Sequence, residues 1–291
     1  MMARTVLIGV DGSSRAADAM AVAALIAPAL DARPALLYAH PYRELESLLS
    51  EGEREQLVRE VAEASARQAR AYFGDAEPPR LELVGNRSEA AALHAAASER
   101  NVAAIVLGSS SRGAIGRVMP GGVAQRLLSG APCPIVVAPA GFAARQPLGL
   151  GAIGAGFDAS AEASDALGFA ARIASANKGP LIVIAVHQRV AFGNLPVGAG
   201  QAVANVNEQL RADLSRDLDK AVNELGMGQE VTARLREGDP AAVLAEESQK
   251  LGLLVVGSRG YGPIGSVFVG SVATRLLRSS SCPVMVVPRG A

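Results

Sequence analysis

The chain contains 291 residues, 49% of them hydrophobic and 3% aromatic, and its 28 basic residues balance its 28 acidic residues. This length allows two ordinary domains, each with its own hydrophobic core. The zero net charge and the scarcity of aromatic side chains argue against nucleic acid or an anionic membrane as a partner. The chain has two cysteines, no apolar run of transmembrane length and no signal-type segment before its first expected strand, so we expect a cytoplasmic protein.

Strands and helices are expected to alternate along the first half. The strands are expected at Thr5–Val10, Ala35–Ala39, Arg80–Val84, Ala103–Leu107 and Pro134–Ala138. The helices are expected from Ser13 to about Ala29, from Arg43 to about Phe73 with an interruption near Gly52, from Ser88 and from Gly122. A serine such as Ser13 is well suited to cap the first of these helices.

The second half repeats the first. The matching pairs are Cys133 and Cys282, Gly108 and Gly257, and Asp11 and Asp158. The two members of each pair lie 149, 149 and 147 residues apart, respectively. Repetition at about half the chain length indicates duplicated domains, which we place at residues 1–140 and 149–291. The irregular segment Ala140–Leu148 between them resembles a linker.

The second half shows the same alternation of strands and helices. Its strands are expected at Leu150–Gly156, Leu181–Val186, Val231–Leu235, Leu253–Val256 and Val284–Val287, and its helices near Ser160, Ala202, Pro240 and Gly270. Five strands separated by helices predict an α/β fold, with two tandem, doubly wound, five-stranded parallel sheets covered on both faces. Ligands bind such sheets beyond the carboxyl ends of the strands.

A glycine-rich segment follows the fourth strand of the second half. Gly257 and Gly260 allow the backbone to turn sharply, and Gly270 and Ser271 begin a helix, where an anion can bind. Asp158, at the end of the neighbouring first strand, is suited to accept hydrogen bonds from an exocyclic amine or a ribose hydroxyl. Together these residues predict a mononucleotide site, although glycines also occur in loops that bind nothing.

The sequence closely resembles the universal stress protein family in its tandem form. The resemblance covers nearly the whole chain and rests on Gly156–Ser160, on Gly238-Asp239-Pro240, on Val255–Gly260 with nine residues to Gly270-Ser271-Val272, and on Cys282–Val287. It implies the strand order 3-2-1-4-5 of adenine-nucleotide α-hydrolase-like proteins. It also implies that ATP, or else ADP or AMP, binds at the glycine motif, with any Mg held through the phosphates.

The resemblance also implies the roles of individual residues. Asp158, with Gly156 and Phe157 beside it, would meet the adenine, and Val186 would line the base pocket. The ribose and phosphates would contact Val256, Gly257, Arg259, Gly260, Gly270, Ser271 and Val272. Because family members commonly pair through their last strands, the two halves would imitate that dimer through Ile135–Ala138 and Val284–Val287. Whether two such chains pair further stays open.

The first half departs from this motif. Ser111 stands in the place of Gly260, and Gly122 in the place of Ser271, so one glycine and one hydroxyl are lost. Asp11 remains, and the other corresponding positions are Ala39, Gly108 and Gly121. Loss of one hydrogen bond to a charged group costs roughly 1.5–3 kcal/mol. We therefore expect weaker or absent nucleotide binding in the first half.

The sequence gives little support for catalysis. The glycine segment is not a P-loop and contains no lysine, and three scattered histidines do not suggest a metal site. We interpret the chain as an ATP-binding, nucleotide-responsive regulator or scaffold in stress response, with at most slow ATP hydrolysis. Two alternatives stay open: a scaffold of the same fold that binds no nucleotide, and an enzyme that depends on an adenine nucleotide.

Overall fold

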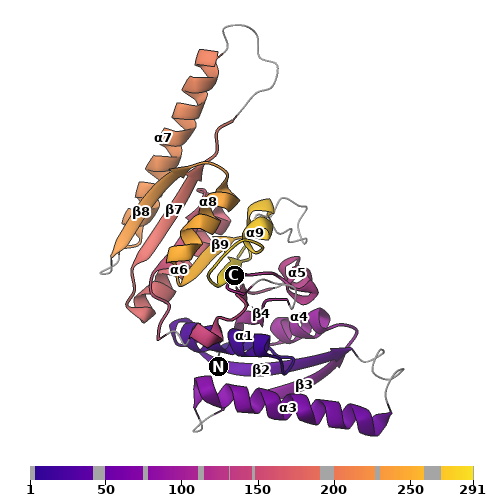
Figure 1. The fold of residues 1–291 in the computed structure, drawn as a ribbon. Coiled ribbons are helices and arrows are strands. Elements are labelled where there is room, and N and C mark those ends of the chain that lie inside the picture. Colours follow the sequence, from indigo (N-terminus) through magenta and orange to yellow (C-terminus); the bar gives the residue numbers. More distant parts are fainter. Residues whose placement is uncertain are drawn as a thin grey trace.

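The computed structural model in Figure 1 describes residues 4–41, 50–74, 78–110, 115–130, 132–145, 148–190, 200–226, 230–258 and 270–290. The elements of the first half are β1 (Arg4–Gly9), α1 (Ser14–Ile26), the 3-10 turn η1 (Pro28–Leu30), β2 (Ala32–Pro41), α3 (Glu51–Phe73), β3 (Leu81–Asn86), α4 (Glu89–Glu99), β4 (Val102–Gly108), α5 (Gly122–Leu128) and β5 (Ile135–Ala138). They follow the predicted order of strands and helices.

The second half contains the same series of elements. After the 3-10 turn η2 (Ala143–Arg145) come β6 (Ile153–Phe157), α6 (Ala161–Asn177), β7 (Leu181–His187), α7 (Gly200–Glu224), β8 (Val231–Glu237), α8 (Pro240–Glu247), η3 (Ser248–Lys250), β9 (Leu253–Gly257), α9 (Ser271–Leu276) and β10 (Val284–Val287). The first strand of this half begins later than predicted, because Gly151 adopts a positive φ of 58° and interrupts the extended chain.

Side-chain caps fix several helix starts. Ser13 and Ser160 cap α1 and α6, as predicted for these serines, by accepting hydrogen bonds from backbone N–H groups of the first turn. The start predicted for the long second helix of the first half, at Arg43, is not testable, because residues 42–49 lie outside the described residues. The predicted interruption near Gly52 stays a prediction, because the chain before Ser50 lies outside the described residues and Ser50 itself is extended. Ser50 and Glu53 form a capping box, so α3 begins at Glu51 and Gly52 lies in its first turn.

The ten strands found in the described residues form one sheet, in the order β3-β2-β1-β4-β5-β10-β9-β6-β7-β8. The predicted order 3-2-1-4-5 is therefore confirmed in each half, with parallel neighbours throughout. At the centre, β10 pairs antiparallel with β5, with Met285 opposite Val136. The two five-stranded sheets are thus continuous, and the seam between them is made by the two last strands.

Helices cover both faces of this sheet. Buried residues of α1, α3, α6 and α7 pack on one face, and those of α4, α5, α8 and α9 pack on the other. The strands of the seam are fully buried, as a parallel sheet with two covered faces requires. In Figure 1 the N-terminal part of α7 extends well beyond the sheet, whereas α3 lies across the first half. None of the helices in the described ranges is long and apolar enough to span a membrane.

The segment between the halves is held in place rather than loose. Asp18 of α1 is only 3% exposed, and its two carboxylate oxygens accept hydrogen bonds from the backbone N–H groups of Gly141 (2.9 Å) and Ala143 (2.8 Å). The repeat reproduces this contact, since Asp165 of α6 accepts from the N–H of Gly290 at 3.2 Å. Each half therefore ties the chain that follows its last strand to its own first helix.

Candidate functional site

A cavity of about 270 Å³ lies at the carboxyl ends of β6 and β9 in the second half. Nine of the residues predicted for the second-half site line it, namely Gly156, Phe157, Asp158, Val186, Val256, Gly257, Gly270, Ser271 and Val272. Arg259 and Gly260, which were also predicted, lie outside the described residues. Residues from four separate segments therefore meet at one place.

The floor of this cavity is apolar. Val256 is only 5% exposed and, with Ile184 and Leu244, belongs to the core on the side of α8 and α9. The Phe157 side chain is also buried but packs in the core on the opposite face, with α6. An apolar floor of this kind suits a flat ring system, as in most small-molecule pockets.

Asp158 follows β6 and is exposed at the cavity. Its Oδ1 accepts a hydrogen bond from the backbone N–H of Ser160 at 3.1 Å and another from the hydroxyl of Ser160. Ser160 in turn caps α6 by accepting from the N–H of Ala163 at 3.2 Å. The helix cap is therefore supplied by the serine, while the carboxylate stays at the strand end and orients that serine.

Gly257 has a structural reason to be glycine. A Cβ atom at this position would lie 2.6 Å from the carbonyl carbon and oxygen of Glu162, because the first turn of α6 crosses the end of β9. Gly108 of the first half is in the same situation, with the backbone of Arg15 against it. The glycine at the fourth strand end is thus required by the packing of the helix, whether or not a ligand is bound.

Gly270 and Gly121 have no such conformational reason. Gly270 is the N-cap of α9 with φ −58° and ψ 150°, and Gly121 is the N-cap of α5 with φ −73° and ψ 173°, both open to any residue. A Cβ at Gly121 would meet Ser110 at an ordinary 3.5 Å, and one at Gly122 would meet nothing within 4 Å. Glycine at these helix starts therefore leaves space at the cavity wall.

An ion pair joins two walls of the second-half cavity. Asp239 caps α8, and its carboxylate also accepts two hydrogen bonds of 2.8 Å from the guanidinium of Arg275 in α9. The hydrogen bonds from Arg275 and from the N–H of Ala242 lower the pKa of Asp239. Because Pro240 and Gly270 both line the cavity, this pair fixes the spacing of the two helices at its mouth.

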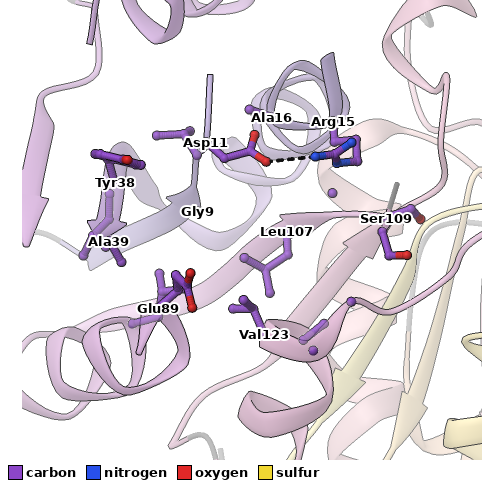
Figure 2. Close-up of a pocket in the computed structure, with 18 of the residues that line it drawn as sticks. Gly9, Asp11, Arg15, Ala16, Tyr38, Ala39, Glu89, Leu107, Ser109 and Val123 are labelled. Carbon is purple, nitrogen blue, oxygen red and sulfur yellow. Dashed lines mark hydrogen bonds and ion pairs between the residues drawn. The ribbon is translucent and has the colours of Figure 1, made fainter. Parts of the chain in front are cut away.

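The first half contains an equivalent cavity of about 410 Å³, shown in Figure 2. All five residues predicted there line it, namely Asp11, Ala39, Gly108, Gly121 and Gly122. Leu57 and Val61 of α3 also line it. None of the lining residues described for the second-half cavity comes from α7, because α7 lies along β7 and β8 and extends past the sheet.

The glycine-rich loop of the first half is anchored to the seam. The hydroxyl of Ser109 donates to the carbonyl of Ala138 at 2.7 Å and accepts from the N–H of Met119 at 3.0 Å. Farther along, the N–H of Val118 donates to the carbonyl of Ser280 in the second half at 2.9 Å. The loop therefore contacts both halves of the molecule.

Both cysteines are free and buried. Cys133 is 4% exposed and Cys282 is 3% exposed, and burial raises the pKa of each thiol to about 12. At neutral pH neither is a thiolate, the form that reacts as a nucleophile.

The two halves were compared with known protein families. The sequence profile of the universal stress protein family matches residues 2–139 and again residues 150–288. This chain belongs to the universal stress protein family. The recognition of a tandem member from the sequence motifs is thereby confirmed.

Relatives and solved structures agree with this assignment. A universal stress protein of Mycolicibacterium smegmatis is 30% identical over 207 residues, which cover 69% of this chain and 67% of the relative. One from Mycobacterium tuberculosis is 27% identical over 243 residues, covering 82% and 83%. The crystal structure of a universal stress protein from Archaeoglobus fulgidus matches the full length of both chains with a TM-score of 0.68 at 18% identity, which shows the shared fold.

One difference between the two universal stress protein halves was missed from the sequence. Four residues after the aspartate, the first half has Arg15 and the second half has Glu162, and both side chains line their cavities. Sequence reasoning compared the aspartates and glycines of the two halves but not the intervening positions. The difference is visible in the sequence when residues 11–15 are aligned with residues 158–162, because Arg15 then stands opposite Glu162.

Proposed function

We propose that this universal stress protein binds an adenine nucleotide in the second-half cavity, and that this nucleotide is ATP. The observation that carries the proposal is the meeting of Asp158, an apolar floor and the Gly270-Ser271 helix start in one cavity. Membership of the family supports a role in stress response, which we infer to be that of a nucleotide-responsive regulator or scaffold. Two buried, unpaired cysteines are in keeping with a reducing cytoplasm.

The residues fit an adenine nucleotide. Asp158 would accept hydrogen bonds from the exocyclic amine or a ribose hydroxyl, and Val186 and Val256 would contact the base. A volume of about 270 Å³ suits the nucleoside part of the ligand, since whole-ligand pockets span about 300–1,000 Å³. The phosphates would extend past Gly270, which has no Cβ, and past Ser271, whose side chain is short. ADP and AMP share this chemistry.

The cavity walls give little support for rapid phosphoryl transfer. No lysine occurs among the lining residues described for the second half, and the described residues contain no group of three or more His, Cys, Asp and Glu side chains that could hold a metal. Any Mg²⁺ would therefore be held mainly through the phosphates. Slow hydrolysis remains compatible with this arrangement.

Nucleotide content and titration test the proposal. Gently purified protein should release adenine nucleotide on denaturation, as measured by mass spectrometry, and emptied protein should bind ATP in calorimetry. Gly270→Asp places a carboxylate at the phosphate end and should abolish second-half binding, while aspartate remains a favourable N-cap that preserves the helix. The matched variant Gly121→Asp makes the same change in the first half and should leave second-half binding intact.

Other results would favour a nucleotide-free scaffold, an enzyme or a different binding site. A protein that purifies empty and ignores millimolar ATP is a scaffold of the same fold without nucleotide. Multiple-turnover release of ADP or pyrophosphate with an identified acceptor would instead indicate an enzyme. A Gly270→Asp variant that binds ATP as well as the wild type would place the ligand elsewhere.

We further propose that residues 1–140 and 149–291 are separate family domains and that the β5–β10 pairing imitates a dimer of single-domain relatives. Antiparallel pairing of two last strands is what such a dimer would require. The fragment 149–291, expressed alone, exposes the edge of β10 and should fold and form a homodimer in analytical ultracentrifugation. A folded monomer at high concentration would contradict the proposed imitation.

A further inference from the structure

Arg15 and Glu162 occupy the same place in the two halves. Each lies in the first turn of the helix that follows the first strand, and each has its backbone packed against the glycine that ends the fourth strand, Gly108 or Gly257. Because the backbone is fixed against this glycine, the side chain is held at the cavity. The duplicated fold thus presents a cation at one cavity and a carboxylate at the other.

In the first half, the charge of Arg15 is available at the cavity. Its Nη2 lies 3.2 Å from Oδ2 of Asp11, and the two side chains are 34% and 52% exposed. Figure 2 shows Arg15 between Asp11 and Ser109, with its guanidinium turned toward Asp11. A guanidinium has five N–H donors, so an ion pair with Asp11 leaves it able to bind phosphate oxygens as well.

Two further polar groups face this cavity from neighbouring elements. Glu89 of α4 lies across from Asp11 in Figure 2, and Tyr38 of β2 lies beside Ala39. Burial raises the pKa of Tyr38, and the negative charges of Asp11 and Glu89 raise it further, so these three groups lie near one another. The acidic groups are therefore gathered at the end of the cavity that would receive the base, away from Ser109.

In the second half, the charge is reversed. Glu162 is 8% exposed, and its Oε1 lies 3.4 Å from Nε of Arg289, whose own side chain is 69% exposed. Asp158 adds a second carboxylate to the same cavity. Asp158, like Asp11, would face the base, so a polyphosphate entering here approaches mainly Glu162. That carboxylate is mostly shielded from water, where repulsion is stronger than in bulk solvent, and its partner Arg289 is exposed and therefore screened.

We propose that this position sets the charge of the nucleotide that each half accepts. Arg15 lets the first-half cavity bind the polyphosphate of an adenine nucleotide without a metal ion. Glu162 makes the second-half cavity favour the nucleotide whose phosphates are neutralised by a divalent cation. The inference rests on the proposed function, namely that the second-half cavity binds an adenine nucleotide, and it extends that binding to the first-half cavity.

The proposal changes the expected relation between the halves. The first half lacks the hydroxyl that Ser271 supplies in the second half, but a charge-assisted contact from Arg15 offsets that loss. The two halves then differ in the form of the ligand they select rather than only in strength. Removing the Arg15 contact should weaken binding of metal-free ATP to the first half by about 10- to 100-fold.

Calorimetry on single-site variants tests the proposal. Gly270→Asp leaves the first half as the working site, and Gly121→Asp leaves the second. Each is titrated with ATP in EDTA and then in Mg²⁺, with adenosine as an uncharged reference ligand. Arg15→Gln and Arg15→Lys are measured on the first background and Glu162→Gln on the second. Arg172→Gln, which removes a charge from the exposed side of α6, controls for net charge.

The expected results are opposite in the two halves. In the first half, ATP affinity should hardly change on adding Mg²⁺. Arg15→Gln should weaken metal-free ATP binding but not adenosine binding, and Arg15→Lys should retain most of it. In the second half, Mg²⁺ should strengthen ATP binding by about 10-fold or more, and Glu162→Gln should raise the metal-free affinity about 3- to 10-fold.

Other outcomes would overturn the proposal. If both halves respond equally to Mg²⁺, or if neither Arg15→Gln nor Glu162→Gln alters the ratio of ATP to adenosine affinity, this position does not select the ligand, although the proposed function stands. If the wild-type chain binds neither ligand in either buffer, the proposed function fails and this inference fails with it.

Discussion

Replacing Asp18 with asparagine removes one of two hydrogen-bond acceptors that hold the segment between the halves. In the wild type, both carboxylate oxygens are used, one by the N–H of Gly141 and one by the N–H of Ala143. An asparagine side chain offers one oxygen and one NH₂ group, so one backbone N–H would face another donor at a site that is only 3% exposed.

The loss can be given a magnitude. A hydrogen bond to a charged group contributes about 1.5–3 kcal/mol, and the relief from burying a charge offsets part of this. We therefore expect Asp18→Asn to lower the free energy of unfolding at pH 7 by about 1–2 kcal/mol. Urea unfolding followed by circular dichroism measures this difference. The matched variant Asp165→Asn should cost less, because Asp165 accepts a single 3.2 Å hydrogen bond, from the N–H of Gly290, which the amide oxygen of asparagine can still accept.

Stability against pH provides a second test of the same reasoning. Burial raises the pKa of Asp18 above its ordinary 3.8, against the opposing effect of the hydrogen bonds from Ala143 and Gly141. The folded state therefore binds a proton more readily than the unfolded state. The part of the Asp18 contribution that depends on protonation is then largest below pH 3.8 and is lost as the pH rises through the raised pKa, which leaves only the hydrogen-bond contribution at pH 7. The gap between wild type and Asp18→Asn should widen on acidification. A gap that is constant or narrows would refute the argument.

Two further predictions concern glycines and thiols. Gly108→Ala should destabilise the protein by about 1–3 kcal/mol, because its Cβ would overlap the carbonyl of Arg15, whereas Gly122→Ala, at an open helix position, should be neutral or stabilise by up to about 1 kcal/mol in thermal melts. Equal effects of the two substitutions would contradict this assignment. Cys133 and Cys282 should resist thiol reagents at pH 8 and react together only on unfolding, since burial raises both pKa values to about 12. Rapid labelling of folded protein would show that one thiol is accessible.

The sequence was sufficient to predict the order of elements and the strand order within each half. Alternating apolar runs, serine caps and the duplicated Cys-Pro segments each indicated the fold locally. It was less reliable at boundaries. For the long helix expected from Arg43 to Phe73, the described part begins only at Glu51, where Ser50 and Glu53 form a capping box. The strand expected from Leu150 begins at Ile153, because Gly151 adopts a positive φ, and the sequence contains no pattern that predicts this backbone conformation.

The residues that line the candidate site were predicted where they belong to recognisable sequence motifs. Asp158, Gly257, Gly270 and Ser271 follow strand ends or begin helices, so topology alone brings them together. Tertiary contacts could not be predicted in the same way. Gly257 faces the backbone of Glu162, which lies 95 positions earlier in the chain, and only the packing of α6 across β9 reveals that contact.

The seam also limits how two copies of this chain can assemble. A strand has two hydrogen-bonding edges, and β5 uses both, one for β4 and one for β10, while β10 lies between β5 and β9. The edges through which single-domain relatives would pair are thus consumed inside one molecule. Within the described residues, the free edges of this sheet belong to β3 and β8, the outermost strands, where a further strand could pair. A homodimer of this chain would therefore use a different surface from the β5–β10 seam. Substitutions at the seam would alter folding of the monomer but would leave that dimer interface unchanged.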